Sequence, residues 1–208
     1  MDDWKYDVLM MREKNLKHQV VTFFFRMIFH MTIQYPPMTK SFHYEAELIV
    51  AIGKEAFQLN QLESATDCIF GYSIGSDLTR RDLQNEAKTL KRPWSTSKSF
   101  DHSAPSGPIV MKQEVEDDAL LPWNANISLS VNGTLKQESS IDKMIWSIPE
   151  MICYLSNYFR LKPGDLIMTG TPAGVDNLNI GDEVVVECGN LPPCRFTIGQ
   201  KETVSQTL

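Results

Sequence analysis

Hydrophobic and polar positions along the chain predict one buried strand more clearly than any other element. The run Leu48-Ile49-Val50-Ala51-Ile52 is continuously apolar and stops at Gly53. A short run of this kind, rich in β-branched residues, predicts a strand that enters a core. Glu45 and Glu47 stand at its start, two positions apart. Because strand side chains alternate, both should project from one face, with Cα atoms about 7 Å apart.

Further strands are predicted in the second half of the chain. Residues 127–131 alternate between apolar and polar, and Asn132-Gly133 then gives a strong two-residue hairpin signal before residues 134–137. Residues 166–168 and 183–187 also have the composition of strands, between turns that contain glycine and proline.

Three helices are predicted between these strands. The first begins with the capping-box pattern of residues 60–63 and has Leu62, Ala65, Ile69 and Tyr72 at helical spacing, so it should run to Gly71 or beyond. The second should start near Ser140, with an apolar face that includes Ile141, Met144, Ile145 and Ile148. The third should carry Pro149 in its first turn, with Ser147 as its cap.

Tyr35-Pro36-Pro37-Met38-Thr39 predicts a loop, and residues 85–98 predict an irregular polar segment. Together the elements predict an α+β domain that is mainly β, with a few short helices.

Composition narrows the class of protein. With 208 residues and 42% hydrophobic content, the chain can bury one sizeable core. A net charge of −6 argues against nucleic acid as a partner, because phosphate binding needs a basic face. The apolar runs are too short to span a bilayer, and the N-terminus lacks the pattern of a secretory signal. We therefore expect no membrane partner and a cytoplasmic location.

The four cysteines suggest buried thiols more than ligands. Cys68 and Cys153 stand in apolar, helix-like contexts. Cys188 and Cys194 flank a short segment, so they could close a small loop or supply two zinc ligands. The zinc interpretation is weak, since no His or second Cys pair lies nearby in the sequence.

Acidic residues supply the candidate metal ligands. Glu45 and Glu47 could converge on one hard divalent cation, which prefers oxygen ligands; the alternative is a solvated strand face. Asp77 follows an apolar segment and is the natural third ligand, although a helix cap or turn aspartate is about as well supported. Two glutamates and one aspartate match the preference of magnesium or manganese, with Ca²⁺ as a further candidate.

Other polar residues could contact a substrate. Arg80, Arg81 and Gln84 could donate hydrogen bonds to a carboxylate or carbonyl, unless one arginine pairs internally with Asp82 or the glutamates. Lys98 could neutralise an anionic oxygen beside the metal, or be a solvated surface lysine. The Thr169–Gly174 loop offers hydroxyls and N–H groups to an oxyanion, and it lacks the ending of a nucleotide P-loop.

Five ordered motifs resemble the fumarylacetoacetate hydrolase family, over roughly residues 35–186. The resemblance is carried by His43-Tyr44-Glu45-x-Glu47-Leu48, Asp77-Leu78-Thr79-Arg80-Arg81-Asp82-Leu83-Gln84, Lys98-Ser99-Phe100-Asp101, Val131-Asn132-Gly133 and Pro163-Gly164-Asp165-Leu166-Ile167-x-Thr169-Gly170-Thr171-Pro172-x-Gly174-Val175. The variants around residues 79–84 and Arg92-Pro93-Trp94 are most similar to the fumarylpyruvate and acylpyruvate hydrolase branch.

This resemblance implies a mixed β-roll, a homodimer and hydrolysis of a carbon–carbon bond in a β-diketo acid. It implies a Mg²⁺ or Mn²⁺ site with Glu45, Glu47 and Asp77 as ligands. Gln84, Lys98 and Thr171 would contact the oxo-acid substrate and take part in catalysis, with Arg81 as a supporting residue. A bound cation would act as template and Lewis acid for the oxo acid, while a general base activates water.

The N-terminal segment departs from the family pattern. Members carry Asn-Tyr-x-x-His-x-x-Glu before the metal strand, whereas this chain has Asn15-Leu16-Lys17-His18 with no glutamate three residues on. Arg26-Met27 stands where Lys-Pro is expected, and His30 has no counterpart in the pattern. We therefore divide the chain into a divergent segment, 1–34, which looks truncated, replaced or mis-spliced, and a catalytic domain, 35–208.

Three functions remain open on this basis. The first is metal-dependent hydrolysis of fumarylpyruvate or another acylpyruvate. The second is binding of a metal and a 2-oxo acid without turnover, since the His/Glu pair is missing. The third is decarboxylation or tautomerisation of an oxo acid, which needs enolate stabilisation more than an activated water.

Overall fold

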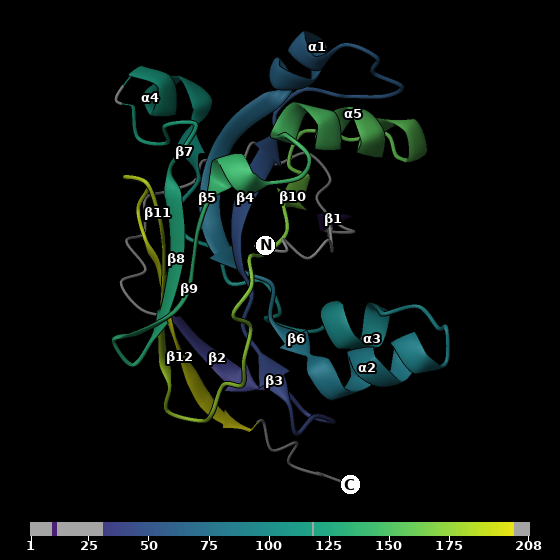
Figure 1. Ribbon diagram of the computed structural model, residues 1–208. Helices are drawn as coiled ribbons and strands as arrows, with labels where there is room; N and C mark the ends of the chain where they lie inside the picture. The colour runs from purple at the N-terminus through teal and green to yellow at the C-terminus, as the bar shows by residue number, and fades with distance from the viewer. Residues whose placement is uncertain (1–9, 12–30, 118, 202–208) are drawn as a thin grey trace, which may run out of the picture.

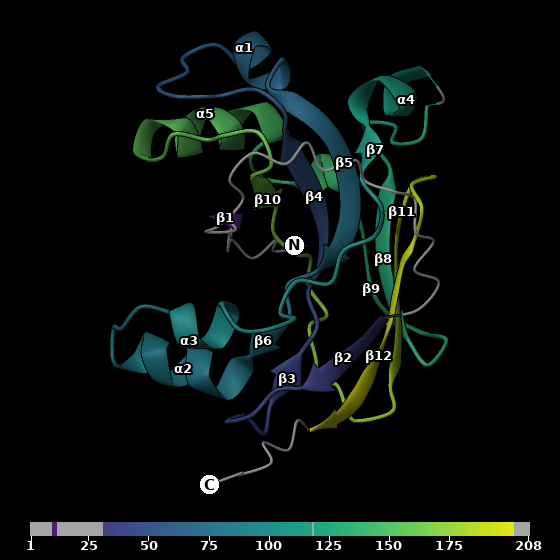
Figure 2. The ribbon, with the colours of Figure 1, turned by 180° about the vertical axis from the view of Figure 1, so that it is seen from behind.

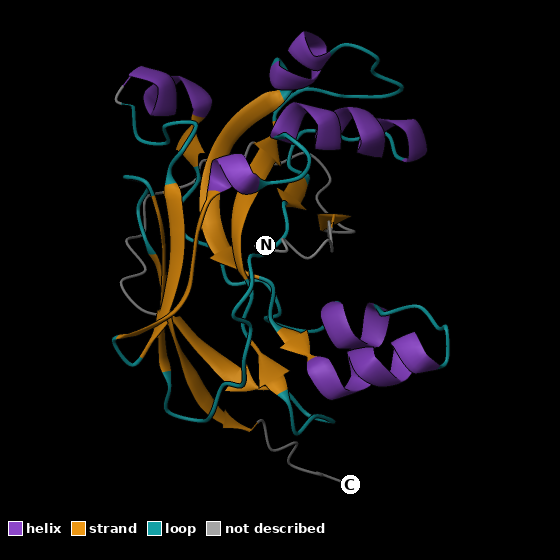
Figure 3. Cartoon of the chain, viewed as in Figure 1, coloured by secondary structure: helices purple, strands orange, loops and turns teal. Residues whose placement is uncertain are grey.

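A computed structural model describes residues 10–11, 31–117 and 119–201, and shows a mainly β protein with short helices (Figures 1 and 3). Its strands form two five-stranded sheets and one two-stranded ribbon. The expected α+β class is thus confirmed. No described helix is both long and apolar enough to cross a membrane.

The first sheet has the order β1-β10-β4-β5-β7, with every neighbouring pair antiparallel. Its strands are β1 (Met10–Met11), β10 (Leu166–Met168), β4 (Ala46–Ile52), β5 (Ile69–Ser76) and β7 (Val110–Met111). Strand β4 is central and all seven of its residues are buried. The continuous apolar run therefore predicts this strand correctly, because a strand covered on both faces needs no polar alternation.

The second sheet has the order β2-β12-β11-β8-β9. Its strands are β2 (Met31–Tyr35), β12 (Cys194–Lys201), β11 (Glu183–Cys188), β8 (Asn126–Val131) and β9 (Thr134–Ser140). β2 and β12 are parallel, and the other pairs are antiparallel. The predicted hairpin joins β8 to β9, with positive φ angles at Asn132 and Gly133. The proposed division at residue 35 stays a prediction, and β2, which ends there, belongs to this sheet.

The helices lie in two groups at opposite ends of the molecule (Figures 1 and 2). α1 (Leu62–Thr66) and α5 (Ile148–Tyr158) pack side by side, and their buried faces meet Val50 and Ile52 of β4. α2 (Arg81–Thr89) and α3 (Ser95–Lys98) form the other group, beside the β3–β6 ribbon (Phe42–His43 and Thr79–Arg80). α4 (Lys112–Asp117) follows β7.

The first predicted helix is too long. α1 ends at Thr66, and Ile69 and Tyr72 belong to strand β5 instead. β5 pairs with β4 on one side and β7 on the other, so its sheet hydrogen bonds outweigh a local helical periodicity. The N-cap residue Gln61 makes no capping bond through its side chain.

The second predicted helix is wrong, and the prediction of an irregular segment over residues 85–98 is partly wrong. Ser140 ends β9, and only a short 3₁₀ turn, Ile141–Lys143, follows. The helix begins at Ile148, where Glu150 accepts hydrogen bonds from the N–H and hydroxyl of Ser147, so the expected cap is confirmed. Residues 85–98 contain the end of α2 and all of α3 rather than irregular chain.

The cysteines are free thiols in the described structure. Cys188 and Cys194 are buried in the core of the second sheet, where burial raises the pKa of each thiol to about 12. A protonated thiol is a poor metal ligand, so these two residues pack as small apolar side chains.

Candidate metal centre

Glu45, Glu47 and Asp77 meet in one buried cluster. One carboxylate oxygen from each lies within 4.8 Å of the others. Glu45 precedes β4, Glu47 is in that strand, and Asp77 directly follows the neighbouring strand β5. The exposed fractions are 3%, 0% and 0%, so these are not glutamates of a solvated strand face.

The register between β4 and β5 brings the three carboxylates together. Ala46 lies opposite Ser76, and the N–H of Asp77 donates to the carbonyl of Glu45 at 2.9 Å. The hydroxyl of Ser76 accepts the N–H of Glu45 at 3.1 Å. Alternation along β4 then places Glu47 on the same face as Glu45. The geometry therefore follows from adjacent strand ends, not from long-range loop packing.

Glu47 fits a cation ligand. Its Oε2 accepts the N–H of Gly170 at 2.7 Å, while its buried Oε1 has no hydrogen-bond partner among the described residues. Burial, followed by the charges of Asp77 and Glu45, raises the pKa of Glu47 well above its usual value. A buried oxygen without a donor, beside two other carboxylates, is costly unless a cation or proton compensates it. The residues present thus fit a hard divalent cation.

Lys98 is a buried member of the cluster rather than a surface lysine. It lies in α3, is 2% exposed, and its Nζ donates to Asp77 Oδ2 at 2.6 Å and Glu45 Oε2 at 2.7 Å. Burial lowers the pKa of this ammonium, but Asp77 and Glu45 raise it more, so the net shift is upward. The site therefore holds a fixed positive charge at neutral pH.

Arg81 and Gln84 extend the cluster along the first turn of α2. Arg81 forms an ion pair with Glu45 and donates to Gln84 Oε1 at 2.6 Å and, more weakly, to His43 Nδ1 at 3.4 Å. Gln84 is buried.

Arg80 turns away, donating to the carbonyl of Thr96 and lying over the ring of Phe100. The internal pairing considered for one arginine is thus made by Arg81 with Glu45, while Asp82 binds Thr39 and the N–H of Lys40.

Thr171 reaches the cluster through a residue that sequence reasoning missed. Its Oγ1 accepts a hydrogen bond from Gln137 at 2.9 Å, and Gln137 also accepts the N–H of Ala46, between the two glutamates. Gln137 is 1% exposed. A glutamine in a short polar strand carries no signal of this role, because its burial depends on a bulge that the pattern does not show.

His18 and His30, in the divergent N-terminal segment, lie outside the described residues. His43 is described and half-buried, with its Nε2 3.0 Å from the hydroxyl of Ser41. Burial and the neighbouring Arg81 lower its pKa. Its ring therefore helps to orient Arg81 beside Glu45.

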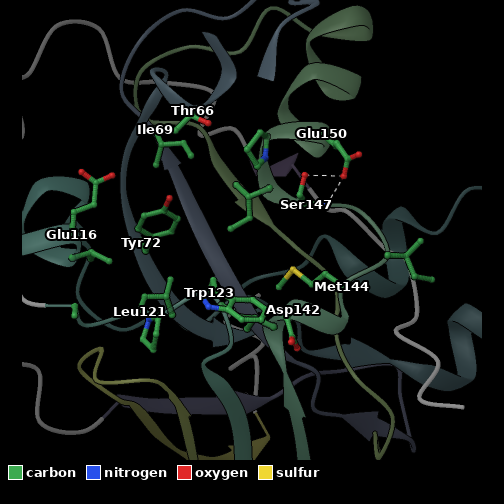
Figure 4. Close-up of a pocket in the computed structure, with 17 residues that line it drawn as sticks. Thr66, Ile69, Tyr72, Glu116, Leu121, Trp123, Asp142, Met144, Ser147 and Glu150 are labelled. Carbon is green, nitrogen blue, oxygen red and sulfur yellow. Dashed lines mark hydrogen bonds between the residues drawn. The ribbon is translucent and has the colours of Figure 1, made fainter. Parts of the chain in front are cut away.

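A separate groove of about 790 Å³ lies between β5, α4 and the start of α5 (Figure 4). Tyr72, Leu121, Trp123, Met144 and Glu150 are among the residues that line it. None of the lining residues belongs to the carboxylate cluster. The groove is mostly apolar, whereas charged groups converge in the buried cluster, so the candidate chemistry lies in the cluster.

A family model described as "Fumarylacetoacetate (FAA) hydrolase C-terminal" matches residues 14–199. The chain belongs to the fumarylacetoacetate hydrolase family. It is 42% identical over 171 residues to a fumarylpyruvate hydrolase from Ralstonia sp., a match that covers 82% of this chain and 86% of that protein. Relatives with another activity are similar as well. An oxaloacetate tautomerase from Escherichia coli (strain K12) is 41% identical over 146 residues, a match that covers 70% of this chain and 65% of that protein.

Solved structures of family members share the fold. The crystal structure of fumarylpyruvate hydrolase from Pseudomonas aeruginosa in complex with Mn²⁺ and pyruvate is 40% identical, with a TM-score of 0.78, covering 83% of this chain and 72% of that chain. A 5-carboxymethyl-2-hydroxymuconate delta-isomerase from Mycobacterium smegmatis is 28% identical with a TM-score of 0.75, covering 84% and 65%. The family fold thus serves hydrolysis, tautomerisation and isomerisation.

Proposed function

We propose that this protein is a metal-dependent hydrolase that cleaves a carbon–carbon bond in an acylpyruvate such as fumarylpyruvate. The observation that carries the proposal is the buried cluster of Glu45, Glu47 and Asp77. Similarity to fumarylpyruvate hydrolases, one of them in complex with Mn²⁺ and pyruvate, supports the substrate class and the metal. Mn²⁺ or Mg²⁺ fits three carboxylates better than Ca²⁺, which takes more oxygen ligands.

The three carboxylates would hold the cation, which when bound supplies a Lewis acid for the oxo acid. Lys98 holds a positive charge beside Asp77 and Glu45, where it can stabilise a developing enolate oxygen. Arg81 and Gln84 would orient a substrate carboxylate, since the guanidinium of Arg81 presents a planar set of donors. Thr171 offers a hydroxyl from the opposite loop.

The test is an assay of the purified full chain with Mn²⁺ or Mg²⁺ on fumarylpyruvate, with fumarate and pyruvate as the products measured. Glu47→Ala should lower kcat/KM by more than about a hundredfold, because even outer contacts of a metal site contribute tenfold to a hundredfold. The matched control is Glu55→Ala, which removes an exposed glutamate paired with Arg160. Equal activity in wild type and Glu47→Ala would contradict the site assignment.

Tautomerisation or decarboxylation of a related oxo acid is the second candidate. It is favoured by the oxaloacetate tautomerases among the relatives, including the one from Escherichia coli. Such reactions depend on enolate stabilisation, which Lys98 and a cation would provide. The test is incubation of the protein with oxaloacetate. A change in keto–enol absorbance reports tautomerisation, and formation of pyruvate reports decarboxylation. Neither reaction is the hydrolysis of fumarylpyruvate, which is assayed separately.

The remaining candidate function is binding of a metal and a 2-oxo acid without catalysis of any reaction. It is motivated by the missing Asn-Tyr-x-x-His-x-x-Glu pattern before the metal strand. Calorimetric binding of oxalate in the presence of Mn²⁺, without conversion of fumarylpyruvate or oxaloacetate, would support it. Turnover of either compound would exclude it.

The homodimer expected from the family is also part of the proposal. The groove beside α4 and α5 exposes 77% of Trp123 and 62% of Ile145. Apolar side chains gathered on one face are typical of protein–protein contacts. The family resemblance implies a homodimer, and we propose this face as its interface.

A further inference from the structure

Gln137 is a buried polar residue that the proposed hydrolysis does not use. It lies in β9, where Leu135 is 55% exposed and Gln137 is 1% exposed. Regular alternation would place residues 135 and 137 on the same face. The register with β8 shifts between Leu129 and Ser130, which pair with Gln137 and Leu135 and leave Lys136 as an extra residue. This bulge turns the amide inward and the leucine outward.

Every hydrogen-bonding role of the Gln137 amide is defined by its partners. Oε1 accepts the N–H of Ala46 at 3.0 Å, and Nε2 donates to Thr171 Oγ1 at 2.9 Å and to the carbonyl of Pro172 at 2.8 Å. A backbone N–H can only donate and a carbonyl can only accept, so the amide has one possible orientation. One side chain thereby joins β4, between Glu45 and Glu47, to the loop that carries Thr171.

The loop itself is pressed against β9 at this point. Gly174 has a φ of +104°, and a Cβ there would lie 2.5 Å from the carbonyl oxygen of Lys136 and 3.2 Å from Gln137 Cγ. The close approach keeps Thr171 and Pro172 within reach of the amide. The bond from Gly170 N–H to Glu47 holds the same loop to the carboxylate cluster.

We infer that Gln137 is a positioning residue that fixes the Thr171 hydroxyl as a hydrogen-bond donor toward a bound oxo acid. Because Thr171 Oγ1 already accepts from Nε2, its own hydrogen is left to point at an anionic oxygen. A carboxylate ligand accepts hydrogen bonds and cannot donate them. A Thr171 hydroxyl that is held as a donor therefore favours binding of a carboxylate. The inference rests on the proposed oxo-acid site and names the residue that sets its donor geometry.

The experiment measures oxalate binding to the Mn²⁺-loaded full chain by calorimetry in a double-mutant cycle. Gln137→Leu and Thr171→Val should each weaken oxalate binding by about tenfold, the value of one hydrogen bond to a charged group. The double variant should also lose about tenfold rather than a hundredfold, because both changes remove the same interaction. Thr171→Ser, which retains the hydroxyl, should bind nearly as wild type does.

Two further variants separate positioning from a general structural effect. Ser139→Ala removes another buried polar side chain of β9, two residues along, and should leave oxalate binding unchanged. Gln137→Glu keeps the size of the side chain but cannot donate to Thr171 or Pro172, so it should weaken binding at least as much as Gln137→Leu. It also serves if the leucine variant does not fold.

Hydrogen exchange in the metal-free protein gives a readout that needs no ligand. Exchange over residues 169–174 and at Ala46 should accelerate in Gln137→Leu and Gln137→Glu, and stay unchanged in Ser139→Ala. A multiplicative loss in the cycle, or unchanged exchange in both Gln137 variants, would overturn the inference. If wild type fails to bind oxalate, the proposed function fails, while exchange in the loop still decides whether Gln137 positions it.

Discussion

At the scale of single residues, the three carboxylates differ in what compensates their charge. Glu45 contacts Lys98 and Arg81, and Asp77 contacts Lys98. Glu47 receives one backbone N–H, from Gly170, and keeps a buried oxygen without a hydrogen-bond partner in the described structure. Among the three proposed ligands, Glu47 therefore depends most on a cation and is the most informative one to change.

Replacing Glu47 by glutamine should separate metal binding from folding. We expect Glu47→Gln to lower Mn²⁺ affinity by about a hundredfold, because an amide oxygen carries no charge. At a pH above the folded pKa of Glu47, the metal-free variant should unfold a few degrees higher than wild type, since there the wild-type side chain carries a buried charge beside Asp77 and Glu45. Calorimetry and thermal unfolding measure both effects, and Glu138→Gln, on the exposed side of β9, is the matched control. Unchanged Mn²⁺ affinity in Glu47→Gln would contradict the ligand assignment.

The raised pKa of Glu47 also predicts how metal binding depends on pH. Its folded pKa lies above the unfolded value, so its contribution to stability is present at low pH and is lost as pH rises through the folded pKa. Bound Mn²⁺ should offset this loss, because the cation takes the place of the proton. The Mn²⁺-induced rise in unfolding temperature should therefore grow as the pH increases above 4.5, the ordinary pKa of a glutamate. A rise that stays constant or shrinks as the pH increases would contradict this prediction.

Residue-scale prediction from the sequence succeeds where alternation decides the outcome. Glu45 and Glu47 share a face because β4 is regular there, and Asp77 joins them because β5 ends beside the start of β4. Gln137 could not be predicted, because the extra residue at Lys136 reverses the expected alternation of β9.

At the scale of elements, the loop after β10 connects the two sheets to the site. Thr169 donates to the carbonyl of Leu48 in β4, and Gly174 packs against the backbone of β9. The loop thus contacts a strand of each five-stranded sheet. Its placement, rather than that of either sheet alone, determines where Thr171 lies relative to the carboxylates.

Gly174 is the position at which this loop is most sensitive to substitution. Gly174→Ala adds a Cβ 2.5 Å from a backbone oxygen at a positive φ, so we expect a loss of about 1–3 kcal/mol in unfolding free energy. Gly164→Ala is the matched control, because its φ is +94° and no atom lies within 4 Å of the added Cβ. It should lose only about 1 kcal/mol, from backbone strain. Chemical denaturation measures both, and equal losses would show that the contact with β9 does not matter.

Helices and strands could be predicted where a local turn or cap determines them. They could not be predicted where pairing with a strand distant in sequence determines them. The Asn132-Gly133 turn and the Ser147 cap could be read locally. Ile69 and Tyr72 match a helical period, yet they pair in a sheet with strands that are distant in sequence. Local spacing carries no information about those partners.

At the scale of the whole molecule, the buried cluster and the apolar groove are built from different residues. The cluster is built from residues at the start of β4 and the end of β5, with Lys98 of α3, while the groove is lined by residues of β5, α4 and the start of α5. Figure 1 shows α2 and α3 at the opposite end of the molecule from α4 and α5. This separation leaves the groove available to a second copy without any change at the carboxylates.

The proposed homodimer can be tested on this face. Trp123→Ser combined with Ile145→Ser should shift the protein from dimer to monomer, since both residues expose most of their surface in the groove. Light scattering after gel filtration measures the mass. Met38→Ser is the control, because Met38 is 80% exposed in the loop before β3, away from the groove. A wild-type protein that is monomeric, or a double variant that stays dimeric, would contradict this face as the interface.

We propose that Glu45, Glu47 and Asp77 together bind one divalent cation. The most direct measurement is anomalous diffraction from crystals of the full chain grown with Mn²⁺. We expect one anomalous peak that contacts an oxygen of each carboxylate, at about 2.0–2.2 Å for a cation of this size. We also expect the peak to be lost in Glu47→Gln. No peak among these carboxylates at saturating Mn²⁺, or a peak held by other residues, would contradict it.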